Sequence, residues 1–212
     1  MSLEDLQKNI YLLVRDKRRR LVFLQTKYFC KFSFIHINKT GGSSIEKALR
    51  VPLIHETALT FRDRIGQKRW DERFSFAIVR NPWDRAVSHF HYRRMTNQAG
   101  LGDNPMAFKE WLKRVYIERV PELMNEEKMF FTQADWVCDE QGRIMVDYIG
   151  RFEHLQESWD RICEHLQREK TLLPHVKKSS RGNFRDYYDA ESRQIIADFF
   201  RPDIELFGYS FD

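Results

Sequence analysis

Apolar residues gather in short runs along the chain, and each of the first two runs is followed by a polar turn and a helical pattern. The first run, residues 32–37, is aromatic and β-branched and stops at the glycine-containing segment 38–42. A short apolar run bounded by glycine predicts a buried strand that ends in a tight turn. An apolar stripe at helical spacing comes next, so we expect a helix that Ser43 and Ser44 can cap and that Pro52 ends.

The same order of elements recurs at the second apolar run, residues 74–79. Asn81 can cap the helix that follows, and Pro82 suits its first position because the N–H that proline lacks would be unpaired there. We expect this helix to extend from about Trp83 to Arg94. Two successive units of strand, turn and helix favour a parallel sheet with covering helices.

Helical spacing predicts further helices over residues 108–115, 155–166 and 195–200. Between the predicted helices 108–115 and 155–166, the stretch 133–150 holds either a hairpin or a third strand, whose apolar part is residues 144–146. The predicted fold class is therefore α/β, a single domain with a central parallel sheet and helices on both faces. Ligands of such sheets bind at the carboxyl ends of the strands.

Length and composition agree with one globular domain. A chain of 212 residues can bury roughly 70% of its unfolded surface, and its 17 phenylalanines indicate an aromatic-rich core. We divide the chain into an N-terminal basic helical segment, residues 1–31, and a domain that spans residues 32–212. The charge run at residues 15–20 is interpreted as a solvated helix face or arm, with a membrane or substrate patch as the alternative.

The charge balance and the cysteines restrict the class of partner and the compartment. Lys and Arg outnumber Asp and Glu by 36 to 31, a mild bias towards anionic partners that does not imply nucleic acid. Cys30, Cys138 and Cys163 are an odd number without CxxC spacing, which suggests neither a disulfide framework nor a zinc site. No apolar window approaches the roughly 18 residues of a membrane span, and residues 1–20 carry charges throughout, unlike a signal peptide. We therefore expect a cytoplasmic protein without a membrane span, and leave its oligomeric state open.

The segment 37–44 joins the first predicted strand to its helix, where backbone N–H groups and the positive end of the helix dipole favour an anion. Lys39 supplies a mobile charge, and Gly41 and Gly42 let the backbone approach an anion closely. Thr40, Ser43 and Ser44 supply hydroxyl donors. The lysine precedes the glycines, which distinguishes the segment from the GxxxxGK[ST] loop of ATP-binding proteins. Taken alone, the segment could also be a plain connecting turn.

A second anion site is predicted where the second strand ends. Arg80 stands at this end and suits bidentate binding of a phosphate, and Ser88 follows two turns into the next helix. Trp83, between them, is interpreted as a packing residue. Two anion sites at the ends of parallel strands would let one nucleotide span both.

Together the two segments resemble the donor-binding signatures of sulfotransferases that use 3′-phosphoadenosine 5′-phosphosulfate (PAPS). Segment 38–44 is similar to the 5′-phosphosulfate loop, P-K-T-G-G-[ST]-S, and segment 80–88 to the 3′-phosphate signature, R-[ND]-P-[WYF]-[DE]-R-x-x-S. The later part of the chain, at residues 150–155, 173–175 and 207–209, resembles the carbohydrate-sulfotransferase branch. Asn38 stands where the pattern usually has proline, which loosens a fixed backbone angle but removes no functional group.

The resemblance implies a P-loop-like sulfotransferase fold and assigns roles to both segments. Lys39 would face the bridging oxygen and sulfuryl group, residues 40–44 the 5′-phosphate, and Arg80 with Ser88 the 3′-phosphate. A cation and backbone donors suit this reaction because negative charge builds on the leaving phosphate oxygen. The implied partners are PAPS as donor substrate and a hydroxyl-bearing acceptor, which is a carbohydrate, a glycolipid or a small molecule. No metal is expected, because no clustered carboxylates or histidines accompany the loop.

The acceptor hydroxyl must lose a proton, and a neutral imidazole can take it near pH 7. His55 is the candidate base, since it precedes a helix that Thr57 can cap and Gly66 ends, where the helix dipole disfavours imidazolium. Family members that resemble this chain often have a histidine at the start of this stretch. A structural role for His55 is the alternative, and Glu56 is the second candidate base.

The other histidines and one polar loop receive weaker predictions. His36 falls inside the first strand run and is interpreted as a packed core residue, whereas His89 and His91 are interpreted as surface or cleft-wall residues. The loop at residues 174–185 is either a solvated basic loop or a lid over donor or acceptor. The residues of this candidate lid are Lys178, Ser179 and Arg181.

Two other classes of protein stay open at this point. A P-loop-like kinase would need a magnesium site and a lysine after the glycines, and the sequence shows neither. A non-catalytic adenine-nucleotide-binding module would have both phosphate motifs but lack a working base.

Overall fold

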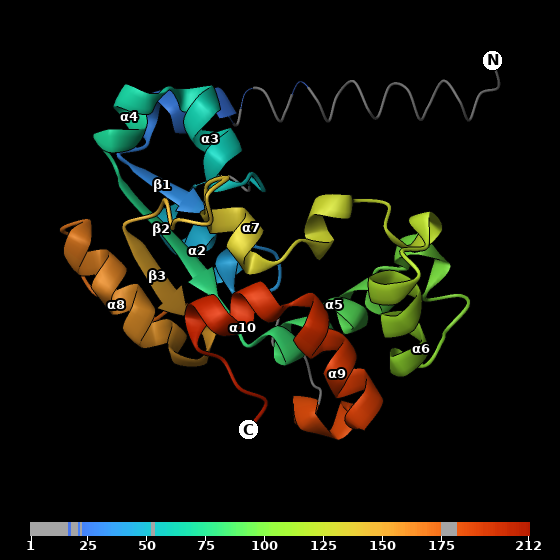
Figure 1. The fold of residues 1–212 in the computed structure, drawn as a ribbon. Helices are drawn as coiled ribbons and strands as arrows, with labels where there is room; N and C mark the ends of the chain where they lie inside the picture. Colours follow the sequence, from blue (N-terminus) through green and yellow to red (C-terminus); the bar gives the residue numbers. More distant parts are fainter. Residues whose placement is uncertain (1–16, 18–20, 22, 52–53, 175–181) are drawn as a thin grey trace, which may run out of the picture.

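A sheet of three parallel strands lies at the centre of the computed structural model, which describes residues 17, 21, 23–51, 54–174 and 182–212. The strands are β1 (Phe32–Ile35), β2 (Phe74–Val79) and β3 (Tyr148–Arg151), with β2 in the middle. Both neighbouring pairs are parallel, and Figure 1 shows the three arrows pointing in one direction. The predicted α/β class with a parallel sheet is confirmed.

Helices cover both faces of this sheet, as the sequence predicts. Helices α3 and α7 pack on one face, and α2 and α8 pack on the other. Successive strand residues point to opposite faces, so Phe76 of β2 packs with Trp159 of α8, whereas the next residue, Ala77, packs with Phe61 of α3. The four helices span Gly42–Leu49 (α2), Ala58–Ile65 (α3), Gln133–Val137 (α7) and Leu155–His165 (α8).

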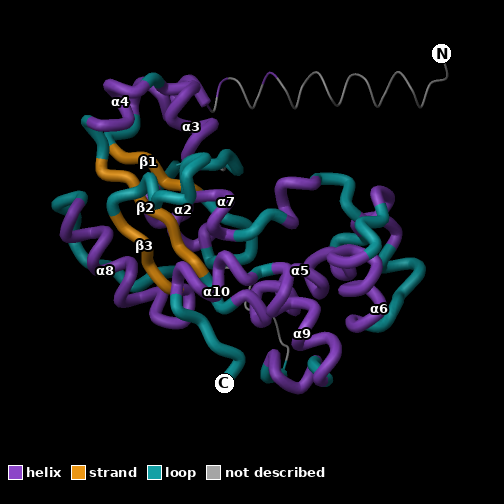
Figure 2. Tube along the Cα trace, in the orientation of Figure 1, coloured by secondary structure: helices purple, strands orange, loops and turns teal. Residues whose placement is uncertain are grey.

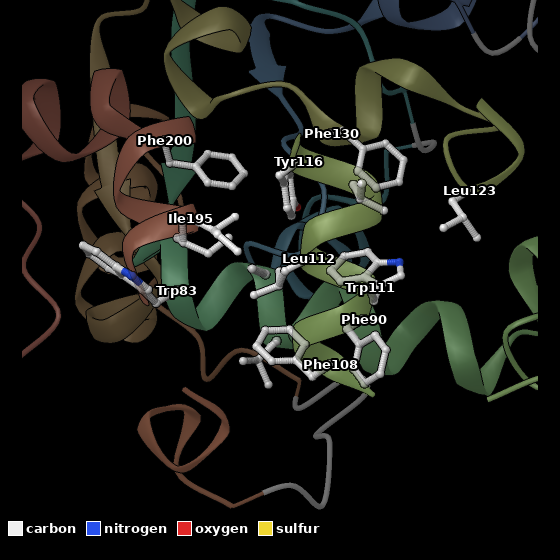
Figure 3. Packing of buried hydrophobic residues seen from close by; sticks show 14 of the residues in the cluster. Trp83, Phe90, Phe108, Trp111, Leu112, Tyr116, Leu123, Phe130, Ile195 and Phe200 are labelled. Atoms are coloured by element: carbon white, nitrogen blue, oxygen red, sulfur yellow. The ribbon is translucent and has the colours of Figure 1, made fainter. Parts of the chain in front are cut away.

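A third apolar cluster lies beyond the sheet and joins helices from distant parts of the chain. Figure 3 shows Phe108 and Trp111 of α6 beside Phe90 of α5, with Ile195 of α9 in the same cluster. Figure 2 shows that the part of the molecule around α5, α6 and α9 is built from helices and loops. The remaining α-helices span Gln67–Asp71 (α4), Pro82–Met95 (α5), Phe108–Leu112 (α6), Ala190–Phe199 (α9) and Arg201–Phe207 (α10). Shorter helical turns span Gln98–Gly100, Lys113–Ile117, Pro121–Leu123, Glu127–Phe130, Phe152–His154 and Phe184–Tyr187.

Helix caps agree with the sequence at two sites and differ at a third. The side chain of Asn81 accepts hydrogen bonds at the start of α5, and that of Thr57 accepts one at the start of α3. Ser43 and Ser44, in contrast, do not cap α2, because they lie inside its first turn. The residue before α2 is Gly41, whose φ of 84° is left-handed. Glycine adopts this conformation at no steric cost, and no side chain caps the start of α2.

The third strand lies later than its apolar pattern predicts. Residues 144–146 are not a strand, although an isolated antiparallel bridge between Cys138 and Ile144 closes a narrow turn. The strand that joins the sheet is β3, in which only Gly150 is buried and which therefore lacks a long apolar run. Pro202 lies in the first turn of α10, where proline is tolerated.

Some predictions concern residues near or beyond the limits of the described chain. The charge run 15–20 lies outside the described residues except for Lys17, and so do Lys178, Ser179 and Arg181. Within the N-terminal segment, residues 23–29 are helical and Phe23 packs against Phe61 of α3. The three cysteines are unpaired. Across the part of the chain that the structure describes, none of the helices has the length and apolar character needed to cross a bilayer.

Candidate active site

The two predicted anion-binding segments meet at the carboxyl edge of the sheet. The first follows β1 and leads into α2, and the second follows β2 and leads into α5. Because β1 and β2 are neighbours and parallel, both turns lie at the same edge. This edge is where open α/β sheets bind their ligands.

The first turn is closely packed around its two glycines. The left-handed Gly41 has no room for a side chain, since an added Cβ would lie 2.9 Å from Leu155 and 3.0 Å from Phe152. At Gly42 an added Cβ would lie 2.2 Å from the His36 ring. Thr40 donates its hydroxyl hydrogen to the Ile37 carbonyl at 2.9 Å, which closes the turn. The turn at the N-terminus of α2 is therefore packed against side chains on the two glycines, which leaves no space for a side chain at either position.

Lys39 extends from this turn towards the helix of the second segment. Its ammonium nitrogen lies 4.0 Å from the centroid of the Tyr92 ring on α5, a cation–π contact. Ser88 and Tyr92 are four residues apart on α5 and therefore share one face of that helix. The structure thus places the lysine of the first segment on the helix face that carries the serine of the second.

Arg80 is buried at the end of β2 and links the two segments directly. Its Nη1 donates to the carbonyl of Lys39 at 2.9 Å, while Nε and Nη2 contact one Asp84 oxygen at 2.8 and 2.6 Å. The guanidinium carbon stacks 3.9 Å from the centroid of the Phe152 ring. The guanidinium plane is therefore fixed on its edges by Asp84 and Lys39 and on one face by Phe152.

The backbone of Arg80 is fixed as well, by a side chain from another part of the chain. The Gln133 amide accepts from Arg80 N–H and donates to Arg80 C=O, both at 2.8 Å. Gln133 also donates to the fully buried Asp203 at 3.1 Å. Burial raises the pKa of the Asp203 carboxyl, and the charge of nearby Arg85 opposes that rise.

A second buried arginine holds the residue before the lysine. Arg85 donates to Asn38 twice, from Nε to the carbonyl at 3.2 Å and from Nη2 to the side-chain oxygen at 2.6 Å. The Asn38 amide nitrogen donates to the Met129 carbonyl at 2.9 Å. Asn38, which departs from the proline of the family pattern, is therefore anchored through its side chain.

His55 stands half-buried beside β1, just before α3. Its Nδ1 lies 2.9 Å from the carbonyl oxygen of His36, and because a carbonyl only accepts, Nδ1 must carry the proton. In neutral imidazole the lone pair then resides on Nε2, the nitrogen that can act as a base. Lys128 donates to the His55 carbonyl at 2.5 Å. The backbone and ring orientation of His55 are thus both fixed.

Glu56, the second candidate base, is held by cations. One of its oxygens accepts from Arg64 at 3.0 Å, and the other lies 3.9 Å from the Lys128 ammonium. Both carboxylate oxygens of Glu56 therefore already have cationic partners.

The remaining histidines differ in part from expectation. His36 is buried, as predicted, and its Nδ1 lies 2.6 Å from the buried Glu46. The prediction that His89 is a surface or cleft-wall residue is wrong, because His89 is buried between Phe130 and Trp111. Burial holds the pKa of His89 well below its ordinary value, with the charges of neighbouring cations adding to the effect. Position 89 falls on the core-facing side of α5, which the polar character of histidine conceals in the sequence.

Two other single-residue predictions have clear outcomes. Trp83 is buried, as expected of a packing residue, and its indole N–H donates to the Arg193 carbonyl at 3.0 Å. His91 is half-buried, and its ring lies 5.2 Å from that of Tyr187.

Several residues that shape the site give little signal in the sequence. Asp84 could have been found, because it stands four residues after Arg80 on a helix, at the spacing of an ion pair. Glu153 could not, since it accepts from Asn81 N–H at 2.6 Å and from Tyr209 O–H at 3.1 Å across large separations in the chain. The chain end is thereby tied to the turn after β2. No group of three or more His, Cys, Asp or Glu side chains suited to a metal ion occurs among the described residues.

Comparison with known proteins gives three similarities. A family model described as "Sulfotransferase family" matches residues 20–210. An uncharacterized protein of Archaeoglobus fulgidus is 24% identical over 129 residues, which are 60% of this chain and 96% of that protein. The crystal structure of a sulfotransferase from Alicyclobacillus acidocaldarius aligns with a TM-score of 0.48 and 17% identity, over 82% of this chain and 92% of that one.

Proposed function

This chain is a member of the sulfotransferase family, and from this premise we propose that it transfers a sulfuryl group from PAPS to an acceptor hydroxyl and releases 3′,5′-adenosine bisphosphate. The observation that carries the proposal is the direct contact between the two segments that would hold the donor. Arg80, the candidate for the 3′-phosphate, donates to the carbonyl of Lys39, the candidate for the sulfuryl group. One bound nucleotide could therefore engage both segments at once.

The donor phosphates would occupy the two helix starts. The backbone N–H groups of residues 41–43, with the hydroxyls of Ser43 and Ser44, would bind the 5′-phosphate at the positive end of α2. Arg80 and Ser88 would bind the 3′-phosphate, with Asp84 and Phe152 keeping the arginine oriented. An oriented arginine loses less conformational entropy on binding than a mobile one.

The transfer step breaks the bond between sulfur and the bridging oxygen of the donor and forms a bond between sulfur and the acceptor oxygen. The electron pair of the broken bond stays on the 5′-phosphate, where Lys39 and the loop N–H groups would stabilise the charge. The proton of the acceptor hydroxyl passes to Nε2 of His55, whose Nδ1–H is held by the His36 carbonyl. Lys39, His55 and the loop thus supply the chemistry without a metal ion in the proposed mechanism.

For the acceptor we propose a sugar hydroxyl on a carbohydrate or glycolipid, with a small hydroxyl compound as the alternative. The support is the resemblance of residues 150–155, 173–175 and 207–209 to the carbohydrate branch. In the structure, Glu153 and Tyr209 from this part of the chain contact each other, and Glu153 also accepts from the N–H of Asn81, the residue after Arg80. We also propose a cytoplasmic location, because three unpaired cysteines fit a reducing compartment.

A transfer assay with radiolabelled PAPS and a panel of glycans, glycolipids, phenols and alcohols tests the proposal. Transfer of label to any acceptor, independent of magnesium, supports it. Transfer of phosphate from ATP that requires magnesium would instead indicate a kinase. Tight binding of 3′,5′-adenosine bisphosphate without transfer to any member of the panel would indicate a nucleotide-binding module.

A further inference from the structure

Lys39 adopts a backbone conformation that a lysine rarely takes. Its φ is 67°, in the left-handed region, which is uncommon for residues other than glycine. Such a conformation persists only where the surrounding structure holds it. The question is therefore which contacts hold Lys39 in place.

The carbonyl groups on both sides of the strained residue accept hydrogen bonds from arginines of the second segment. Arg85 Nε donates to the Asn38 carbonyl at 3.2 Å, and Arg80 Nη1 donates to the Lys39 carbonyl at 2.9 Å. Two consecutive peptide groups are thus fixed by charged donors, which form stronger hydrogen bonds than neutral ones.

Arg85 makes the larger set of these contacts. Besides the Asn38 carbonyl, it binds the Asn38 side-chain oxygen at 2.6 Å and the Phe131 carbonyl at 2.9 Å, and the side chain is buried. Asn38 in turn reaches Met129 at 2.9 Å. Where the family pattern has a proline that would fix φ covalently, this chain has an asparagine that is fixed by its partners.

We propose that Arg85 and Asn38 form a brace that holds Lys39 in its left-handed conformation, so that Arg85 is a positioning residue for sulfuryl transfer. This inference rests on the proposed function of Lys39. Arg85 is buried and donates three hydrogen bonds to protein oxygens, so it acts through Lys39 and not through the donor.

The chain offers a matched control for the loss of a buried arginine. Arg93 lies on the same helix, is fully buried and donates to Gln98, the Leu123 carbonyl and Asn125. None of these partners belongs to the first segment. Arg85→Met and Arg93→Met therefore both remove a buried charge, but only the first removes the brace.

The test is a double-mutant cycle with Lys39→Ala, measured as kcat for sulfuryl transfer. We expect Arg85→Met to lower kcat by about 10-fold to 100-fold, the loss typical of a reactive group misplaced by about 1 Å. Lys39→Ala should then lower kcat only a little further in the Arg85→Met protein. In the Arg93→Met protein it should lower kcat as much as it does in the wild type. The reason is that the effects of mutations in residues that act as a unit do not add. Independent, multiplying losses from Arg85→Met and Lys39→Ala would overturn the proposal.

Two further measurements keep the outcome decisive. If Arg85→Met does not fold, Asn38→Ala removes the side-chain half of the brace and enters the same cycle. Amide hydrogen exchange over residues 38–41 should be faster in Arg85→Met or Asn38→Ala than in the wild type, and unchanged in Arg93→Met. Equal exchange rates in these variants and in Arg93→Met would contradict the brace, whether or not the chain transfers sulfate. A wild-type chain that transfers no sulfate would contradict the proposed function alone.

Discussion

The ring of His36 lies directly against Gly42, and this single contact constrains the turn before α2. A methyl group at position 42 would lie 2.2 Å from the ring, and the ring is also held by Glu46 at 2.6 Å. We expect Gly42→Ala to destabilise the fold by about 1–3 kcal/mol, the usual cost of overpacking a buried site. Binding of 3′,5′-adenosine bisphosphate should weaken at the same time, because the first turn of α2 must move.

Urea unfolding and calorimetry measure the two effects. The control is the same substitution in a His36→Ala chain, where the ring is absent and the added methyl has space. An equal cost of Gly42→Ala in both chains would show that the contact with His36 is not its cause.

His55 is the residue whose role decides between an enzyme and a binding module. His55→Ala should fold and bind the bisphosphate normally, because the side chain is only half-buried and its ring N–H bonds to a backbone carbonyl. Its transfer rate should fall by about 10²–10⁴-fold, the usual contribution of a positioned base. The wild-type rate should decline in acid as imidazole takes up a proton, and the residual activity of the variant should lack this decline.

Glu56→Gln is the matched variant for this experiment. It removes the charge of the second candidate base and should leave most of the rate in place. Full activity of His55→Ala together with loss in Glu56→Gln would transfer the role of base to Glu56. A His55→Ala chain that does not fold would show that the histidine is structural.

At the scale of elements, local patterns predict what depends on neighbours in sequence. The strand β2 and helices α5 and α3 begin and end close to where apolar runs, Asn81, Thr57 and Gly66 place them. The start of α2 differs from the prediction, because residues 41–44 are compatible both with a serine cap and with a left-handed glycine before the helix. The third strand lies after the apolar run at residues 144–146, because only one of the four residues of β3 is buried.

Because two strand–helix units meet at one edge of the sheet, we also expect the chain to distinguish between nucleotides with one and two phosphate groups. The chain should bind 3′,5′-adenosine bisphosphate more tightly than AMP, because only the bisphosphate can reach both the turn before α2 and the pair Arg80 and Ser88. Hydrogen bonds to charged groups contribute about 1.5–3 kcal/mol each, so each contact corresponds to roughly a tenfold gain or more in affinity. Isothermal titration calorimetry measures the difference directly.

The matched variant is Ser88→Ala. It should reduce the difference in affinity between 3′,5′-adenosine bisphosphate and AMP, because it weakens binding of the bisphosphate and leaves AMP binding unchanged. Equal affinities for the two nucleotides in the wild-type chain would contradict the assignment of the second segment. A Ser88→Ala variant that weakens both nucleotides alike would place the serine elsewhere in the site.

At the scale of the whole molecule, the parts of the site that the sequence does not reveal are those joined by the fold. Gln133 pairs with the backbone of Arg80 across 53 residues, and Asp203 adds a contact from 70 residues beyond Gln133. Neither residue lies in a motif, and a glutamine in a short helix can make many other contacts, so the sequence does not identify Gln133 as the partner of Arg80. The sequence predicts which residues contact a ligand, because ligand chemistry dictates residue types, but not which residues hold them.

The buried carboxyl of Asp203 should make the stability of the whole fold depend on pH. The carboxyl is fully buried, accepts hydrogen bonds from Gln133 and Ala134, and has its pKa raised, chiefly by burial. The folded state therefore holds this proton more tightly than the unfolded state, so the contribution of Asp203 to stability falls as pH rises from the ordinary aspartate pKa, about 3.9, through the raised one. In Asp203→Asn this dependence is absent.

Urea unfolding at a series of pH values should show that the wild-type stability minus that of Asp203→Asn decreases with rising pH and then becomes constant. Asp198→Asn on α9 is the control for the loss of an exposed carboxyl. A difference that increases with pH would mean that the contacts with Gln133, Ala134 and Arg85 outweigh burial, and that the Asp203 carboxylate stabilises the fold as an anion.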